Sequence, residues 1–260
     1  MDNTIFDESA RTNHAILQQL ACFVTNFKQR VTMGYTDTKE LKDTMLVIGK
    51  HVDLFNKNDD VTPVLDGSIA ILTRLIDLPE ITIDANVLHA VYNAFVALFN
   101  LVNCEGKRAC QLSVSPRLCD AMYWIMMSLN DIDTLRICME FISLIVWRDG
   151  FLIIDLSLFV TPVVRLLFHE NVDVIFEAGR TLATLILKER IAPENIVASG
   201  ACSQIVRLMY KSHDFVVKST LGLTHQMIWI DDSIVPQLNE CGLSRALLTM
   251  VKSTNIKISE

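Results

Sequence analysis

Apolar residues recur along this chain at spacings of three and four, which place side chains on one face of an α-helix. Near the N-terminus, Thr36, Asp37 and Glu40 are polar residues that favour the start of a helix, and they stand between two apolar stripes. The pattern predicts two amphipathic helices here, with apolar positions Ile16, Leu17, Leu20, Val24 and Phe27 in the first and Leu41, Met45, Ile48, Val52 and Phe55 in the second.

The longest uncharged stretch runs from Ala85 to Cys104, and about 20 residues suffice for a helix to cross a bilayer. Its polar residues follow a helical spacing and fall on one face. They are Asn86, His89, Asn93, Asn100 and Asn103. A helix that faces lipid does not carry such a stripe, so we expect an amphipathic helix of a soluble protein and no membrane span.

The C-terminal half of the chain repeats itself at a nearly constant interval. Residues 200–212 return as residues 242–253, so that Gly200 is matched by Gly242. Two further pairs of segments match at offsets of 42 and 40, namely residues 163–168 with 205–210 and residues 131–135 with 171–175. The offsets agree closely enough to define a repeat.

A period of about 40 residues, with two long apolar helical segments and a short connector in each copy, is typical of helical solenoids. One copy is too thin to bury its own apolar face, so neighbouring copies stack and share a core. The 260 residues include only 9 Gly and 6 Pro, well below the average usage of roughly 7% and 5%. We therefore predict an all-α fold of long helices joined by short turns.

Two kinds of segment recur within the repeats. In residues 195–208 a turn with small residues and Gly precedes apolar pairs, and in residues 94–101 Ala, a small residue, Leu and Asn follow one another at helical spacing. These segments resemble the turn with second helix and the third helix of the armadillo family. Looser copies of the third-helix pattern lie at residues 138–145, 178–185 and 219–226.

The resemblance implies a right-handed armadillo-like α-solenoid. About four degenerate repeats would cover residues 60–253, and residues 1–57 would form N-terminal capping helices, because the end of a solenoid has to be covered. We expect residues 1–260 to form a single armadillo-like domain.

In armadillo proteins the third helices line a concave groove, where a ladder of Asn side chains binds the backbone of an extended peptide. An Asn amide suits this role because it offers a donor and an acceptor together. The resemblance places Asn100 at the ladder position, with Leu144, Thr184 and His225 as its equivalents in the other repeats. Importin alpha also carries Trp one turn earlier, where this chain has Val96, Glu140, Arg180 and Leu221, so an importin-alpha-like transport adaptor is disfavoured.

The resemblance thus implies a groove of mixed chemistry for a peptide or partner helix. The candidate residues are Asn93, Asn100, Glu140, Ser143, Thr184, Lys188, His225 and Trp229. For the Asn stripe, a binding face and an ordinary solvated helix face both stay open. Trp147 and Trp229 are either interface anchors or packed between repeats, and packing is the favoured interpretation. We expect Trp124 in the core.

The charge of the chain restricts the classes of partner, and its cysteine content indicates the compartment. The formal net charge of −7 and the absence of a cluster of Lys and Arg disfavour nucleic acid as the main ligand, whereas a basic peptide or protein is electrostatically favoured. Seven scattered Cys, mostly among apolar neighbours and not spaced with His as in a zinc site, indicate reduced thiols in a cytoplasmic or nuclear protein.

Motifs for catalysis are missing from the sequence. It contains no phosphate-binding glycine loop, no dinucleotide fingerprint, no His-Glu-x-x-His and no nucleophile elbow. The acidic pairs Asp59-Asp60 and Asp231-Asp232 fall in predicted loops, where Asp serves as a cap or turn residue. We expect no catalytic residue, metal or cofactor. The predicted function is a protein-interaction module or adaptor. The alternatives are a structural subunit that uses the convex surface and a degenerate importin-alpha-like transport adaptor.

Overall fold

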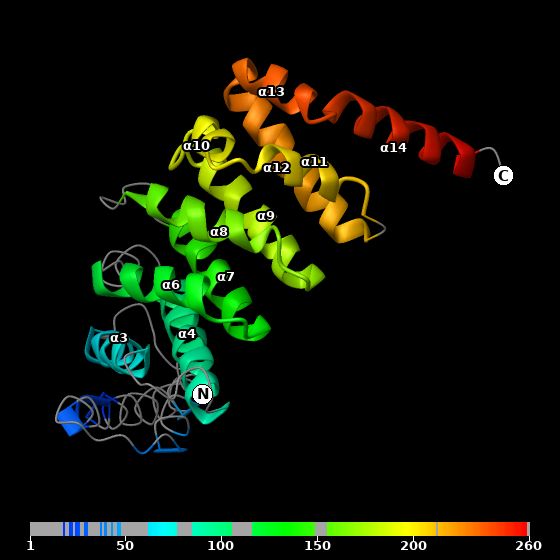
Figure 1. Cartoon of the computed structure of the whole chain (residues 1–260). Coiled ribbons are helices and arrows are strands. Elements are labelled where there is room, and N and C mark those ends of the chain that lie inside the picture. Colours follow the sequence, from blue (N-terminus) through cyan, green and yellow to red (C-terminus); the bar gives the residue numbers. More distant parts are fainter. Residues whose placement is uncertain are drawn as a thin grey trace, which may run out of the picture. The chain divides into compact units, whose positions relative to one another are not determined.

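A computed structural model describes residues 62–76, 85–105, 116–148, 155–211 and 213–258, together with scattered positions between 18 and 47. Within this described part all regular structure is helical (Figure 1). The chain divides into two compact units, Met1–Leu152 and Ile153–Glu260, which are described separately below. The single domain over residues 1–260 stays a prediction.

The first unit contains two pairs of helices. The described helices are α3 (Thr62–Ile76), α4 (Ala85–Glu105), α6 (Pro116–Ser128) and α7 (Ile132–Arg148). Helix α4 packs against α3 and α7, and α6 packs against α3 and α7. At the centre of the contact between α4 and α7, the rings of Phe95 and Phe141 lie 6.0 Å apart between centroids and are fully buried.

A close contact joins the N-terminal segment to this unit. A Cβ atom added at Gly67 of α3 would overlap Cγ1 of Val24, which is fully buried. Glycine is therefore required here for the close approach of Val24 to the α3 backbone. Most of residues 1–57 lie outside the described residues, so their role as capping helices stays a prediction.

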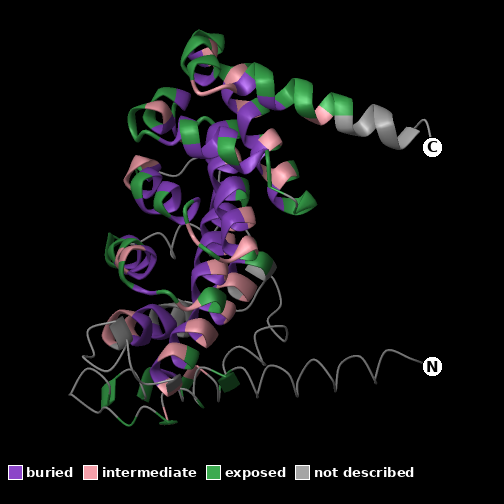
Figure 2. Ribbon diagram, turned by 45° about the vertical axis from the view of Figure 1, so that its right-hand side comes forward, coloured by how far each residue is buried: buried purple, intermediate pink, exposed green. Residues whose placement is uncertain are grey.

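The second unit repeats an arrangement of short helices followed by a long one. Its elements are η3 (Leu156–Phe159), α8 (Val160–Leu166), α9 (Val172–Leu187), α10 (Pro193–Ala198), α11 (Cys202–Leu208), α12 (Asp214–Ile230), η4 (Asp232–Ile234), α13 (Val235–Glu240) and α14 (Leu243–Ile258). Helix α8 packs against α9 and α11 against α12, while α9 and α12 pack against each other. The buried residues gather on the facing sides of these helices (Figure 2).

The turns that precede the second helices explain the two matched glycines. Gly200 and Gly242 have φ angles of +78° and +95°, in the left-handed region that side chains with a Cβ rarely adopt. Gly200 lies between α10 and α11, and Gly242 lies between α13 and α14. The predicted register of the repeats is thus confirmed at these turns.

The long helices fall where the third-helix pattern predicts them. Helices α4, α7, α9 and α12 contain the four segments that carry this pattern. Within the described residues, no helix combines the length and the hydropathy needed to cross a membrane.

Candidate partner-binding faces of the long helices

Helices α4 and α7 of the first unit lie side by side and run parallel. Near their C-terminal ends, a guanidinium nitrogen of Arg148 donates to the backbone oxygen of Asn103 at 3.0 Å and also to its side-chain oxygen. Near their N-terminal ends, residues of both helices line a common cavity. The two helices therefore share one solvent-facing side.

This shared side, which we call the α4–α7 face, follows the helical spacing. Its members are all exposed or partly exposed and recur every three or four residues, whereas most of the residues between them are buried. They are His89, Tyr92, Asn93, Val96, Asn100 and Asn103 on α4, and Asp133, Arg136, Glu140, Leu144 and Trp147 on α7. The polar stripe predicted for residues 85–104 is thus the exposed side of α4.

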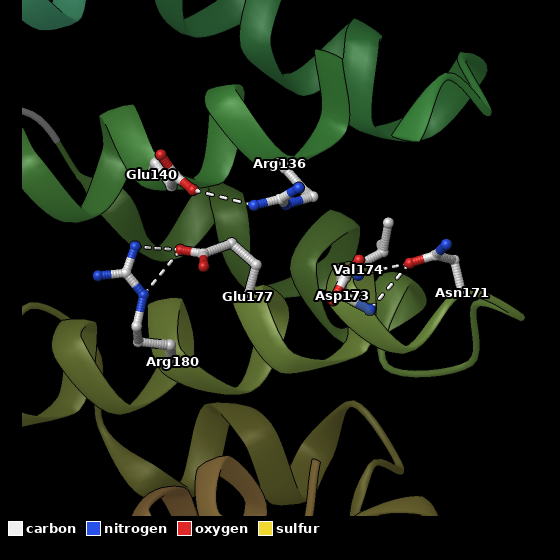
Figure 3. A network of polar contacts seen from close by, with 7 residues as sticks. All are labelled: Arg136, Glu140, Asn171, Asp173, Val174, Glu177 and Arg180. Atoms are coloured by element: carbon white, nitrogen blue, oxygen red, sulfur yellow. Dashed lines mark hydrogen bonds and ion pairs between the residues drawn. The ribbon is translucent and has the colours of Figure 1, made fainter. Parts of the chain in front are cut away.

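Three of the four predicted site residues in this unit lie on the α4–α7 face. Asn93, Asn100 and Glu140 are partly exposed. The Glu140 carboxylate meets Arg136 at 3.9 Å, a distance at the outer limit of an ion pair (Figure 3). Such a pair on the surface contributes little to stability, so Glu140 can replace Arg136 with another cation at low cost. Ser143 is only 2% exposed and lies in the core instead.

A cavity of about 300 Å³ opens at the N-terminal end of the α4–α7 face. It is lined by Leu88, His89, Tyr92, Asp131 and Asp133. Asp131 also caps α7, because its carboxylate accepts from the backbone N–H of Thr134 at 2.9 Å. No pattern in the sequence predicted this cavity. Its only signal in the sequence is the pair of Asp residues around the start of α7. Because Asp is equally expected there as a helix cap, this signal does not identify a cavity.

In the second unit, α9 and α12 also run parallel and present a common side, which we call the α9–α12 face. The rings of Phe176 and Phe215 meet edge to face near the N-terminal ends, with centroids 6.1 Å apart. The exposed stripes again recur every three or four residues. They consist of Asp173, Phe176, Arg180, Ala183 and Leu187 on α9 and of Phe215, Lys218, Gly222, His225 and Trp229 on α12.

The α9–α12 face is aromatic and basic. Phe215 is 60% and Trp229 is 76% exposed. The His225 ring stacks on Trp229 with centroids 6.2 Å apart and an angle of 21° between the planes, and the Lys218 ammonium lies 5.9 Å from the Phe215 ring. Exposed aromatic and cationic groups of this kind are typical anchors of protein interfaces.

Predicted site residues of the second unit divide between this face and the core. His225 and Trp229 belong to the face, and Lys188 is partly exposed directly after α9. Thr184 is 6% exposed, and its hydroxyl donates to the Arg180 carbonyl of its own helix at 2.9 Å. Thr184 therefore has an internal partner and no surface on which a peptide could pack.

The armadillo resemblance implied an exposed Thr184 on α9, but Arg180, one turn earlier, is the residue that is exposed there. Its guanidinium binds the carboxylate of Glu177, with Nε and Oε1 2.8 Å apart (Figure 3). The Glu177 side chain is 4% exposed and that of Arg180 is 44% exposed. Arg180 thus neutralises a buried acid while one side of it stays in contact with solvent.

The structure contradicts the favoured interpretation that Trp147 and Trp229 pack between repeats. Trp147 is 53% exposed and Trp229 76% exposed, so neither is packed in a core. Both stand near the C-terminal ends of long helices. Trp124 on α6, expected in the core, is only partly buried.

The buried cysteines are poor nucleophiles. Burial raises the pKa of the Cys119 thiol to about 11, with a smaller contribution from the nearby charge of Asp120. Burial alone also strongly raises the pKa of Cys138, and it is the main cause of the raised pKa of Cys202. Because the thiolate is the reactive form, these three residues are unsuited to catalysis at neutral pH.

Comparison with known proteins identifies the fold. No protein-family model and no curated protein sequence matches the chain. Among solved structures, a designed armadillo repeat protein superposes with a TM-score of 0.63 at 16% identity, covering 87% of this chain and 91% of its own. Computationally designed armadillo repeat proteins for modular peptide recognition also give 0.63, at 17% identity, with 87% and 91% covered.

A third match is a designed armadillo repeat protein in complex with the peptide (KR)4. It has a TM-score of 0.63 and 16% identity, with 87% of this chain and 90% of that chain covered. These similarities show that the chain folds as an armadillo-like α-solenoid, as the sequence predicted. Of these three matches, one is designed for modular peptide recognition and another is in complex with a peptide.

Proposed function

We propose that this armadillo-like solenoid is a non-catalytic adaptor that binds a peptide or a partner helix along its third helices. The observation that carries the proposal is the exposed stripe that recurs on the four helices with the third-helix pattern, α4, α7, α9 and α12. These stripes hold Asn, charged and aromatic side chains, where a helix with no binding role needs only solvated polar residues.

Asn93 and Asn100 would bind the peptide backbone. They lie seven residues apart on α4, which is two helical turns or about 10 Å along the axis. An extended peptide covers this distance in about three residues. Both amides can therefore meet peptide groups of one strand, and each provides a donor and an acceptor.

The side chains around these amides favour a basic peptide on the first unit. Glu140 lies on the same face, and Asp131 and Asp133 line the cavity at its end, beside the Tyr92 ring. A Lys or Arg side chain that entered the cavity would meet two carboxylates and an aromatic ring. The net charge of −7 supports the same preference.

Fluorescence anisotropy with a labelled (KR)4 peptide tests this proposal. The double variant Asn93→Ala, Asn100→Ala should bind about tenfold more weakly, because it loses two side chains that bond the peptide backbone. The variant Asp131→Asn, Asp133→Asn should weaken (KR)4 and leave an uncharged control peptide of equal length unaffected. Equal affinity of the wild type and the Asn double variant, in this assay and in partner recovery from cells, would refute the proposal.

A second function, a structural subunit of a larger assembly, is favoured by a different pair of residues. Phe168 and Tyr210 are 55% and 51% exposed and occupy the same place in consecutive repeats, just after α8 and α11. The variant Phe168→Ser, Tyr210→Ser separates the two functions. It should leave peptide binding intact, and loss of a co-purifying partner in this variant, but not in the Asn variant, would favour the assembly role.

A further inference from the structure

The C-terminal helix α14 exposes apolar side chains at positions that preceding helices bury. In the register set by Gly200 and Gly242, Leu248 corresponds to Val206 of α11 and, one repeat earlier, to Val164 of α8. Val206 and Val164 are 2% and 6% exposed, whereas Leu248 is 61% exposed. The same residue position therefore changes from core to surface at α14.

Two neighbouring positions behave in the same way. Val251, which is 57% exposed, corresponds to Met209 at 3% and Leu167 at 1%. Leu247, which is 39% exposed, corresponds to Ile205 and Val163, both fully buried. Leu247, Leu248 and Val251 form a stripe on one side of α14, which we call the α14 face.

The earlier repeats show what normally covers such a face. Helix α8 packs against the long helix α9 and also against α10, and α11 packs against the long helix α12 and also against α13. Among the residues that the structure describes, none forms a corresponding long helix after α14, which extends from α13 with its described side chains mostly exposed (Figure 2). The long helices that pack against α8 and α11 are amphipathic, so an amphipathic α-helix also fits the α14 face.

The charges beside the α14 face select the chemistry of that helix. Arg245 and Lys252 stand three residues before and four residues after Leu248, so both flank it on the helix surface. The sequence of α14 contains no acidic residue. In a chain with a net charge of −7, α14 is therefore a basic element that attracts acidic groups.

We propose that the α14 face docks an amphipathic helix of a partner protein, with acidic residues along the edge that meets Arg245 and Lys252. This helix takes the place on α14 that α9 takes on α8 and α12 takes on α11. None of its residues belongs to the α4–α7 face or the α9–α12 face, so it provides a second point of attachment beyond the peptide-binding role.

Two labelled peptides with the sequence of residues 214–230 test the proposal, because α12 is the long helix that packs against α11. In the acidic peptide, Glu replaces Lys218, Gly222 and His225, which are exposed on α12. In the basic peptide, Gly222 and His225 are replaced by Lys. We expect the full chain to bind the acidic peptide about tenfold or more tightly than the basic one, with strong weakening by salt.

The variant Leu248→Ser, Val251→Ser should bind the acidic peptide at least about tenfold more weakly, since these side chains form the centre of the contact. Both residues are exposed, so the variant should keep the circular dichroism spectrum and the melting temperature of the wild type. The variant Phe168→Ser, Tyr210→Ser serves as the control and should bind normally. The variant Arg245→Gln, Lys252→Gln should reduce the preference for the acidic peptide.

Three results would overturn the proposal. One is no binding of the acidic peptide at millimolar concentration. Another is equal binding by the wild type and the Leu248→Ser, Val251→Ser variant. The third is a concentration-dependent dimer in light scattering that this variant abolishes, because the occupant would then be a second copy of the chain.

Discussion

Gly179 of α9 lies so close to Ser219 of α12 that a Cβ atom at residue 179 would stand 3.1 Å from Ser219 Oγ and 3.4 Å from Ser219 Cβ. Both residues stand in the third-helix pattern, and their contact sets how closely the two long helices of the second unit pack. By contrast, a Cβ atom at Gly222 would meet nothing within 4 Å.

These two glycines predict opposite effects on stability. Gly179→Val should lower the free energy of unfolding by about 1–3 kcal/mol, because the added methyl groups force α9 and α12 apart. Gly222→Ala should raise it by about 0.5–1 kcal/mol, because alanine favours the helix and open space surrounds it. Urea unfolding followed by circular dichroism measures both. The same sign for the two changes would contradict the close packing of α9 on α12.

The turn glycines make a second prediction. Gly200→Ala and Gly242→Ala should each destabilise the chain by about 1–2 kcal/mol, because an L residue with a Cβ is strained in the left-handed region. Open space surrounds both positions, so the cost comes from the backbone alone. Gly200→Asn should recover part of the loss, since Asn tolerates this conformation better. Equal stability of Gly200→Ala and wild type in urea would refute the strain.

Much of this architecture is readable from the sequence, because helical period, repeat interval and turn glycines are local features. The constant repeat interval aligns Val163, Ile205 and Leu247, and it places a second helix at each of these positions. The degree of burial is a different matter. Leu247 is apolar like Val163 and Ile205, which are fully buried, yet it is 39% exposed.

The site residues show a similar division. Asn93, Asn100 and His225 could be placed on a face because polar residues in an apolar helix mark its solvent side. Thr184 could not, because a hydroxyl can bond the carbonyl of its own helix and then tolerates burial. Trp229 is a large aromatic residue of a kind that is usually buried, yet it is 76% exposed beside the end of helix α12.

Thiol reactivity provides a third prediction. Brief treatment of the native protein with iodoacetamide at pH 7.5, roughly a unit below the pKa of an unperturbed thiol, should modify Cys22, which is exposed. Cys119, Cys138 and Cys202 should resist, because they are buried and their pKa values are raised. Peptide mapping by mass spectrometry identifies the modified residues. Denaturation in urea should make all of them reactive, and rapid native labelling of Cys138 would contradict its burial.

The loop after α12 predicts a pH-dependent contribution to stability. Hydrogen bonds from the backbone N–H of Ser233, and then from its hydroxyl, lower the pKa of Asp231 from its ordinary value of 3.8. The Asp231 carboxylate caps η4 in this way, with its Oδ1 2.9 Å from the Ser233 nitrogen. The folded state therefore favours the ionised form more than the unfolded state does.

The sign of the effect follows from this lowered pKa. The contribution of Asp231 to stability is fully present above pH 3.8, the pKa expected in the unfolded chain, and disappears as the pH falls through the lower pKa of the folded state. Asp231→Ala should thus be less stable than wild type at pH 7, and this difference should shrink toward pH 2. Urea unfolding at a series of pH values measures it. The neighbouring variant Asp232→Ala serves as a control for the general effect of removing a charge, and a difference for Asp231→Ala that stays constant from pH 7 to pH 2 would show that the ionised cap does not contribute.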